Sequence, residues 1–524
     1  MQSTAIGNRS LGMGDPALNI RRLIVGGGIS LGLAVALQRA FAFITTALVA
    51  RIGGVAVLGE YSIALSTAGV VGALAGTGAG TVALRHAGQF HRSTKAYRKV
   101  LTLIVLITIV AGLSAGALVV AGSNSLAQFV LTNEKLSLTL KVAAVAVVVV
   151  VLFEGLNGLL IALQDFRSLI LISVVSGALM ILTMPYASRF GAGPVLVSYA
   201  IALLLGIVVA CLSARASLAP LPWDGGVEPT PPRTRDVLLF GNTQQLNTIV
   251  IGLASWLVIV LVTRHDPTLH QMGVYVVGSQ LRVLVGTAPT LLSQLVLPML
   301  SRVTAWPQQH DRVLGICTFV CAALSLIPAG VILITLPWVL ALYGLASYEA
   351  LVTSSILVAT AVVQLSYVPS ANALMMQSLR ASLLFNFMWS LSLALIAAKL
   401  TADLGASGAA LAWLFSQLMS QVFVMGLLKR ADRLPQGTMI TLCLADFAVL
   451  SLAGLTLLRL VNKSLAFRLT IIQIVLFIGF LLVFLRVSQR RDYLPSDARS
   501  LLLAFKSAPS IFFSSLFPAR TVQN

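Results

Sequence analysis

Among the ionisable side chains inside the long apolar runs of this sequence, three are the candidates for chemistry. Arg39 and Arg282 lie in the first and the eighth of these runs, and Glu154 lies near the centre of the fourth. An ionisable residue inside a membrane span is costly and usually faces a cavity or a partner, so each marks a candidate functional position. A guanidinium presents a planar fork to two oxygens of a phosphate and stays charged in a low dielectric. The two arginines therefore predict an anion-binding site.

Two amides accompany these arginines. Gln38 adjoins Arg39, and Gln280 stands close to Arg282. Amides hydrogen-bond sugar hydroxyls, although bonds between helices are their commoner use inside membranes. These four residues form the predicted binding set for a pyrophosphate and a glycan.

Glu154 has two competing interpretations. A carboxyl in mid-membrane can bind a proton in one state of a transporter and release it in another, which is what proton coupling needs. Alternatively, Glu154 forms a permanent ion pair with Arg39 or Arg282. The sequence leaves both open.

Signatures of enzymes, cofactors and metal sites are missing from the sequence. The five histidines lie in loops, the four cysteines lie inside apolar runs, and no glycine-rich phosphate loop is followed by a lysine. We therefore expect a protein that is not an enzyme, with no cofactor, no metal site and no ATP hydrolysis.

The composition determines the broad class. The chain has 524 residues, of which 58% are hydrophobic and 10% charged, and its mean hydropathy is +0.96. A soluble protein of this size needs more charge to cover its surface, so the chain is predicted to be a polytopic membrane protein. The net charge of +19 is scattered over short loops, which favours membrane orientation over nucleic-acid binding as its explanation.

Fourteen apolar runs are long enough to span a bilayer, so the expected fold is an all-α integral membrane protein with about 14 transmembrane helices. The expected organisation is a cytoplasmic tail (1–23), a first six-helix lobe (24–214), a proline-rich cytoplasmic linker (215–240), a second six-helix lobe (241–428), two additional helices (439–487) and a cytoplasmic or interfacial tail (488–524). With the N-terminus inside, 24 of the 35 Lys and Arg residues fall on inner segments, 8 on outer loops and 3 within spans. This asymmetry predicts that both termini are cytoplasmic.

A short pattern occurs twice. Arg51 ends an apolar run and Gly59-Glu-Tyr61 opens the next, while Arg264 and Gly273-Val-Tyr275 repeat the arrangement. Two related halves are therefore expected, and transporters built this way bind substrate between the halves near the bilayer midplane.

These segments resemble the Wzx-type polysaccharide flippases of the multidrug/oligosaccharidyl-lipid/polysaccharide exporter superfamily. The resemblance covers residues 20–435 and is carried by ARIGGVAVLGEY (50–61), Arg85, the segment 273–303, NALMMQSLRASLLFN (372–386) and LGASGAALAWLFSQ (404–417). It implies two pseudo-symmetric six-helix lobes in a V-shape around a cationic lumen. The last two spans are similar to the lipid-groove pair of MurJ-type lipid II flippases.

The resemblance also implies a function. Such proteins move an undecaprenyl-pyrophosphate-linked oligosaccharide across the bacterial inner membrane, from the cytoplasmic to the periplasmic leaflet, for O-antigen or exopolysaccharide synthesis. Membrane lipids, a polysaccharide polymerase and export machinery are the expected partners. The alternatives are an ion-coupled multidrug antiporter of the same superfamily and a polytopic glycosyltransferase or polymerase.

Overall fold

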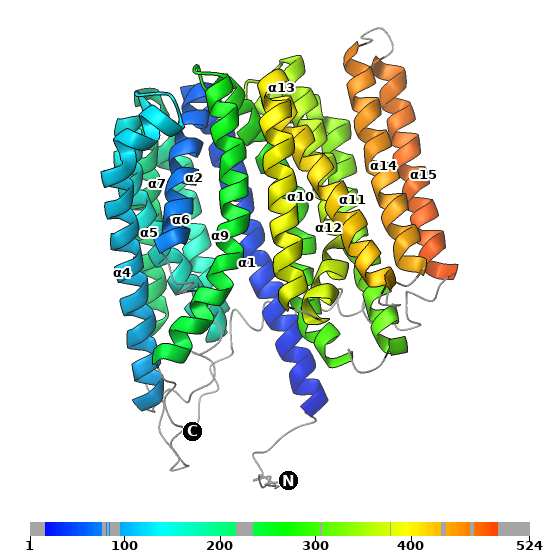
Figure 1. The fold of residues 1–524 in the computed structure, drawn as a ribbon, viewed down its shortest axis with the longest axis horizontal. Coiled ribbons are helices and arrows are strands. Elements are labelled where there is room, and N and C mark those ends of the chain that lie inside the picture. Colours follow the sequence, from blue (N-terminus) through cyan, green and yellow to red (C-terminus); the bar gives the residue numbers. More distant parts are fainter. Residues whose placement is uncertain are drawn as a thin grey trace, which may run out of the picture.

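The structure is a computed structural model that describes residues 16–75, 80, 83, 95–215, 234–303, 307–377, 379–430, 436–461 and 466–490. Its elements in chain order are α1 (Pro16–Gly53), α2 (Val55–Ala75), α4 (Lys95–Ser125), the π-helix η2 (Leu126–Val130), α5 (Leu136–Ala162), α6 (Phe166–Ala187), the 3₁₀-helix η3 (Ser188–Phe190), α7 (Ala192–Ser213), α9 (Thr234–His265), α10 (His270–Val303), α11 (Pro307–Leu342), α12 (Tyr348–Gln377), α13 (Leu379–Arg430), α14 (Gln436–Val461) and α15 (Ala466–Arg490). Helices that run side by side make up the part described (Figure 1).

The chain is an all-helical membrane protein. In the described ranges, 12 helices are long and apolar enough to cross a bilayer. The helix α10 is not counted among these 12. The segment Leu383–Arg430 counts as one helix, although its backbone breaks at Gly405, where φ is 57° and ψ is −129°. The total of 14 transmembrane helices stays a prediction.

Helices extend further than the apolar runs suggested. The helix α1 begins at Pro16, inside the predicted tail 1–23, and α9 begins at Thr234, inside the predicted linker 215–240. Proline suits the first turn of a helix, and nothing after Pro232 breaks the helical sequence. Apolar runs mark only the part of a helix that lies in lipid. Most of the basic loop 85–99 and of the tail 488–524 lies outside the described residues.

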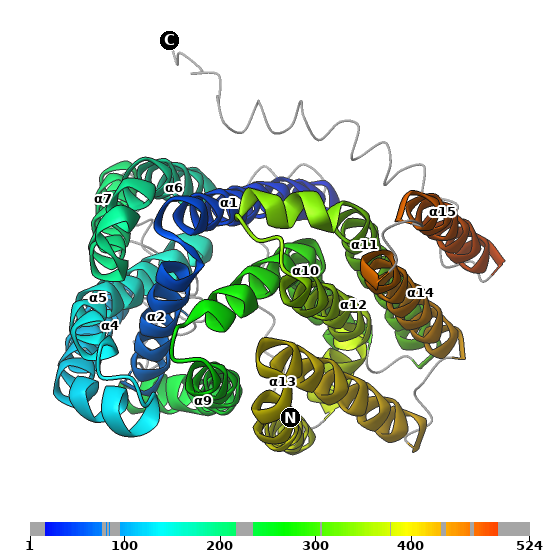
Figure 2. The same cartoon turned by 90° about the horizontal axis from the view of Figure 1, so that it is seen from above.

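Viewed from above, the helices gather into two groups (Figure 2). Helices α1, α2 and α4–α7 form one group, called here the N-lobe, and α9–α13 form the other, called the C-lobe. The helix α14 packs against α11 and α12, and α15 packs against α14 at the far edge of the C-lobe. Across the seam between the lobes, α2 contacts both α9 and α10.

The seam is tightest where two glycines meet the opposite helix. A Cβ atom added at Gly59 of α2 would lie 2.5 Å from the carbonyl oxygen of Leu269, and one added at Gly273 of α10 would overlap the Val55 carbonyl. These are the glycines of the two repeated Gly-x-Tyr patterns. The repeat therefore supplies the flat surfaces that let α2 and α10 cross closely. The α1–α2 turn at Gly54 lies beside this crossing, and we call this side of the molecule the Gly54 end.

Candidate functional site

A cavity of about 340 Å³ lies between the lobes. Gln38 and Arg39 line it from α1, and Gln280 lines it from α10. Arg39 is the one charged residue among the described lining residues, and its side chain is exposed to this space. The structure thus brings together three of the four residues of the predicted binding set, from opposite lobes.

Helical spacing explains which residues reach this cavity. On α10 the lining residues Met272, Tyr275, Val276, Ser279 and Gln280 recur every three or four positions, so they share one face. At about 100° per residue, Arg282 is turned roughly 200° away from Gln280. The face that meets the N-lobe therefore contains the amide and not the guanidinium.

Arg282 lies elsewhere in the C-lobe. Its guanidinium carbon stands 3.7 Å from the centroid of the Trp413 ring, which is a close cation–π contact. Its Nη1 atom is buried and has no hydrogen-bond partner in the described part of the chain. Arg282 is absent from the described cavity lining, so a direct role in substrate binding stays a prediction.

Hydroxyl groups also line the cavity between the lobes, called here the central cavity. Tyr61 and Tyr275 line it from the two lobes, and Ser173, Ser176 and Tyr199 line it from α6 and α7. The repeated Gly-x-Tyr pattern already marked Tyr61 and Tyr275. Nothing in the sequence distinguishes the two serines from the many other serines in apolar runs.

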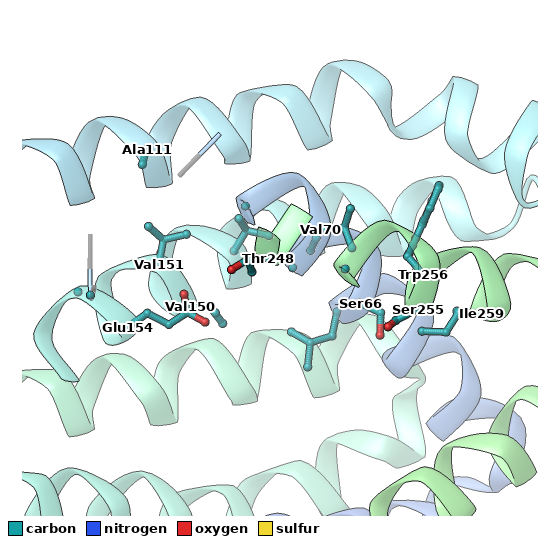
Figure 3. A pocket seen from close by; sticks show the side chains of 18 of the residues that line it. Ser66, Val70, Ala111, Val150, Val151, Glu154, Thr248, Ser255, Trp256 and Ile259 are labelled. Carbon is teal, nitrogen blue, oxygen red and sulfur yellow. The ribbon is translucent and has the colours of Figure 1, made fainter. Parts of the chain in front are cut away.

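Glu154 lines a second cavity of about 600 Å³, whose walls are mostly aliphatic. Figure 3 labels it on α5, together with Ser66 on α2 and Thr248 and Ser255 on α9, around the same space. It is the one charged residue in the described lining, and neither Arg39 nor Arg282 belongs to that lining.

The two cavities are neighbours. Leu65, Ser66, Tyr199 and Ile259 line both of them. Arg39 in the central cavity and Glu154 in the second cavity thus face adjoining spaces. Both volumes fall in the range of about 300–1,000 Å³ that small-molecule sites occupy.

At the Gly54 end, two arginines bond the lobes together. Arg264 of α9 donates from Nε to the Val130 carbonyl at 2.6 Å and from Nη2 to the Phe129 carbonyl at 2.7 Å. Arg51 of α1 donates from Nη1 to the Ala341 carbonyl at 3.5 Å. The acceptors are the last two carbonyls of η2 and a carbonyl in the last turn of α11, that of Ala341, which also accepts from the Gly344 N–H. Carbonyls at the C-terminal end of a helix favour positive charge. Each arginine of the repeat therefore caps a helix of the opposite lobe.

Further contacts support this closure. The Tyr343 hydroxyl lies 3.4 Å from both the Phe43 carbonyl and the Thr46 hydroxyl, and Asn133 donates to the Pro267 carbonyl at 3.3 Å. The Gly54 end is the side that the charge asymmetry predicts to be periplasmic.

Arg264→Gln is expected to loosen this closure, because it removes two charge-assisted hydrogen bonds. The measurement is maleimide labelling of Ser62→Cys in the central cavity, applied from the periplasmic side after the four native cysteines are replaced. We expect labelling about tenfold faster with Arg264→Gln than without it. Arg51→Gln, which removes one longer bond, should have a smaller effect. Equal labelling rates in all three proteins would contradict a latching role.

Solved structures with a similar arrangement of helices are known. The lipid II flippase MurJ in an inward closed conformation superposes with a TM-score of 0.64 at 16% identity, over 87% of this chain and 98% of that one. An inward-facing multidrug resistance MATE family transporter of the MOP superfamily gives a TM-score of 0.58 at 14% identity, over 75% and 95%. A MOP superfamily transporter from Pyrococcus furiosus gives 0.53 at 14%, over 82% and 96%.

At the level of sequence, no family model and no curated protein matches the chain. These three structural neighbours are transporters. At such identities the likeness shows the fold, and a Wzx assignment within that fold stays a prediction. The chain has the all-helical membrane fold of the multidrug/oligosaccharidyl-lipid/polysaccharide (MOP) superfamily.

Proposed function

We propose that this protein is a lipid-linked oligosaccharide flippase of the bacterial inner membrane. It moves an undecaprenyl-pyrophosphate-linked glycan from the cytoplasmic to the periplasmic leaflet by alternating access, for polysaccharide biosynthesis. The observation that supports this best is the central cavity, which Arg39, Gln38 and Gln280 line from both lobes.

The chemistry of that cavity suits such a head group. Arg39 offers a fork of donors to two phosphate oxygens, and no acid stands among the described lining residues to repel them. The amides and the hydroxyls of Tyr61 and Tyr275 can exchange hydrogen bonds with sugar hydroxyls. The fold shared with a lipid II flippase is consistent with a lipid-linked substrate.

A multidrug antiporter is the second candidate, and the Glu154 cavity favours it. An apolar space of about 600 Å³ with a single acid fits a lipophilic cation better than a pyrophosphate. The structural likeness to a multidrug resistance transporter is consistent with this candidate.

Reconstitution of the purified chain separates the two candidates. Proteoliposomes would be loaded with a fluorescent undecaprenyl-pyrophosphate disaccharide, and its exposure would be followed with an impermeant quencher. A flippase exposes the inner-leaflet pool, whereas an antiporter instead accumulates ethidium against an imposed proton gradient. Ethidium uptake without any flipping would overturn the proposal.

Glu154→Gln tests proton coupling, because the amide mimics the protonated acid at nearly constant shape. We expect normal abundance in the membrane and loss of the dependence of flipping on an imposed pH gradient. A structural ion pair predicts low abundance instead, restored by Arg39→Gln or Arg282→Gln. Normal abundance with unchanged dependence on the gradient would contradict both interpretations.

A further inference from the structure

A polar pair formed by a buried Gln421 and a half-buried Asp446 lies at the junction of α13 and α14, and neither residue lines the two cavities. Gln421 of α13 donates from Nε2 to Oδ2 of Asp446 of α14 at 2.7 Å. The other oxygen of each group, Oδ1 of Asp446 and Oε1 of Gln421, is inaccessible and has no hydrogen-bond partner among the residues that the structure describes. Gln421 is 4% exposed. Two buried acceptors without a donor are costly, so this site needs a donor that would serve both.

The polar groups around this pair do not supply the missing hydrogen-bond donor. The Tyr367 hydroxyl of α12 donates to Oε1 of Gln417 at 2.5 Å, one turn before Gln421. The Ser420 hydroxyl donates to the Ser416 carbonyl at 2.7 Å. Both hydroxyls, one on α12 and one on α13, already donate to other acceptors.

Positive charge is also missing near Asp446 in the described ranges. On α11, the Cys321 thiol faces the Pro289 carbonyl, and Cys317 lies one turn before it. On α14, Arg459 donates to the Ile334 carbonyl and to Gln473, while Cys443 is exposed. The other charged residues of these helices stand towards helix ends or at the break in α13: Asp311 and Arg312 on α11, Glu349 on α12, Arg380, Lys399, Asp403, Lys429 and Arg430 on α13, and Arg468, Arg486 and Arg490 on α15.

We propose that Asp446 and Gln421 form a proton-binding site. A proton on Oδ1 turns that acceptor into a donor, which can then bond Oε1 of Gln421. Together with the existing bond from Nε2 to Oδ2, the carboxylic acid and the amide complete a reciprocal two-bond pair. One proton thus satisfies both unpaired oxygens and removes a buried charge.

A proton fits this site better than a metal ion. A hard metal cation needs a shell of about six oxygens, and this pair offers two free ones. Loss of the proton would leave a charge and two unpaired acceptors between α13 and α14, so the packing of α14 becomes sensitive to pH. The site lies outside the glycan-binding cavity and does not depend on the proposed function.

Infrared spectroscopy of the purified full-length chain in nanodiscs tests the site. The wild type should show the C=O stretching band of a protonated carboxylic acid at neutral pH, and the band should disappear as the pH rises. Because the Glu154 carboxyl could give a band of its own, the comparison is made in the Glu154→Gln background. Glu154→Gln alone should keep the band, and the double variant Glu154→Gln/Asp446→Asn should lack it. A band that persists unchanged in the double variant would overturn the assignment.

Thermal unfolding gives a second readout. In Asp446→Asn two amides can form both bonds without a proton. We therefore expect its melting temperature to lose the wild-type decline that runs from mildly acidic pH to the pH at which the infrared band disappears, the range in which the unfolded chain has lost this proton and the folded site still holds it. A wild-type melting temperature that rises with Na⁺ but not with K⁺, without the infrared band, would assign a metal ion instead. A pH-independent melting temperature without the band would assign a water bridge to an ionised Asp446. Either result overturns the proposal.

Discussion

Arg39→Gln is expected to reduce flipping of an undecaprenyl-pyrophosphate glycan at least about 100-fold. Arg39 is the one charge in the described lining of the central cavity. Two charge-assisted hydrogen bonds to a pyrophosphate contribute about 1.5–3 kcal/mol each, and about 1.4 kcal/mol corresponds to a factor of ten. The measurement is the initial flipping rate in proteoliposomes, normalised to the amount of protein inserted.

Two further variants make this result specific. Arg39→Lys keeps the charge but loses the planar fork, so we expect an intermediate rate if bidentate recognition matters. Arg189→Gln is the matched control, because Arg189 stands outside the cavity, 5.8 Å from the centroid of the Tyr186 ring. A normal flipping rate in Arg39→Gln would remove the anion site from the proposed function.

Gly273→Ala is expected to cause a comparably large loss, from the addition of one methyl group. The new Cβ would overlap the carbonyl of Val55, so α10 and α2 must separate at the crossing near the Gly54 end. Alanine is otherwise favoured over glycine in a helix by about 1 kcal/mol, so any loss has to come from the clash. We expect flipping to fall below detection and periplasmic labelling of Ser62→Cys to increase.

Gly426→Ala is the control for that experiment. It makes the same change in α13, where an added Cβ meets nothing within 4 Å, so abundance and flipping should stay at wild-type levels or rise slightly. If Gly273→Ala behaved like Gly426→Ala, the close crossing of the lobes would have no role in the transport cycle.

The sequence predicted the residue types of the site better than their directions. The cost of a charge in an apolar run is a local property, so Arg39 and Glu154 could be identified without a structure. Which face of α10 meets the N-lobe depends on how the two lobes dock. Gln280 and Arg282 are only two positions apart on α10, yet Gln280 lines the cavity and Arg282 stacks on Trp413.

The ends of helices show a similar limit. The helix break at Gly405 lies in a segment with few apolar residues. The helices α1 and α9 begin before the predicted lobes 24–214 and 241–428, because backbone hydrogen bonding continues into polar sequence that hydropathy does not detect. The capping of η2 by Arg264 was out of reach, since it joins residues more than 130 positions apart.

The wall of the Glu154 cavity connects lobe movement to the charge of an acid. Helices of the N-lobe form most of that wall, but Thr248, Gly252, Ser255, Trp256 and Ile259 come from α9 of the C-lobe. If the lobes rotate apart, α9 moves away from this cavity, and water replaces an apolar neighbour of the Glu154 carboxyl. Ionisation is less costly in water than beside hydrocarbon, so the open arrangement favours the carboxylate and the closed one favours the acid. By thermodynamic linkage, the proton then biases the lobes towards closure to the same extent that closure favours the proton.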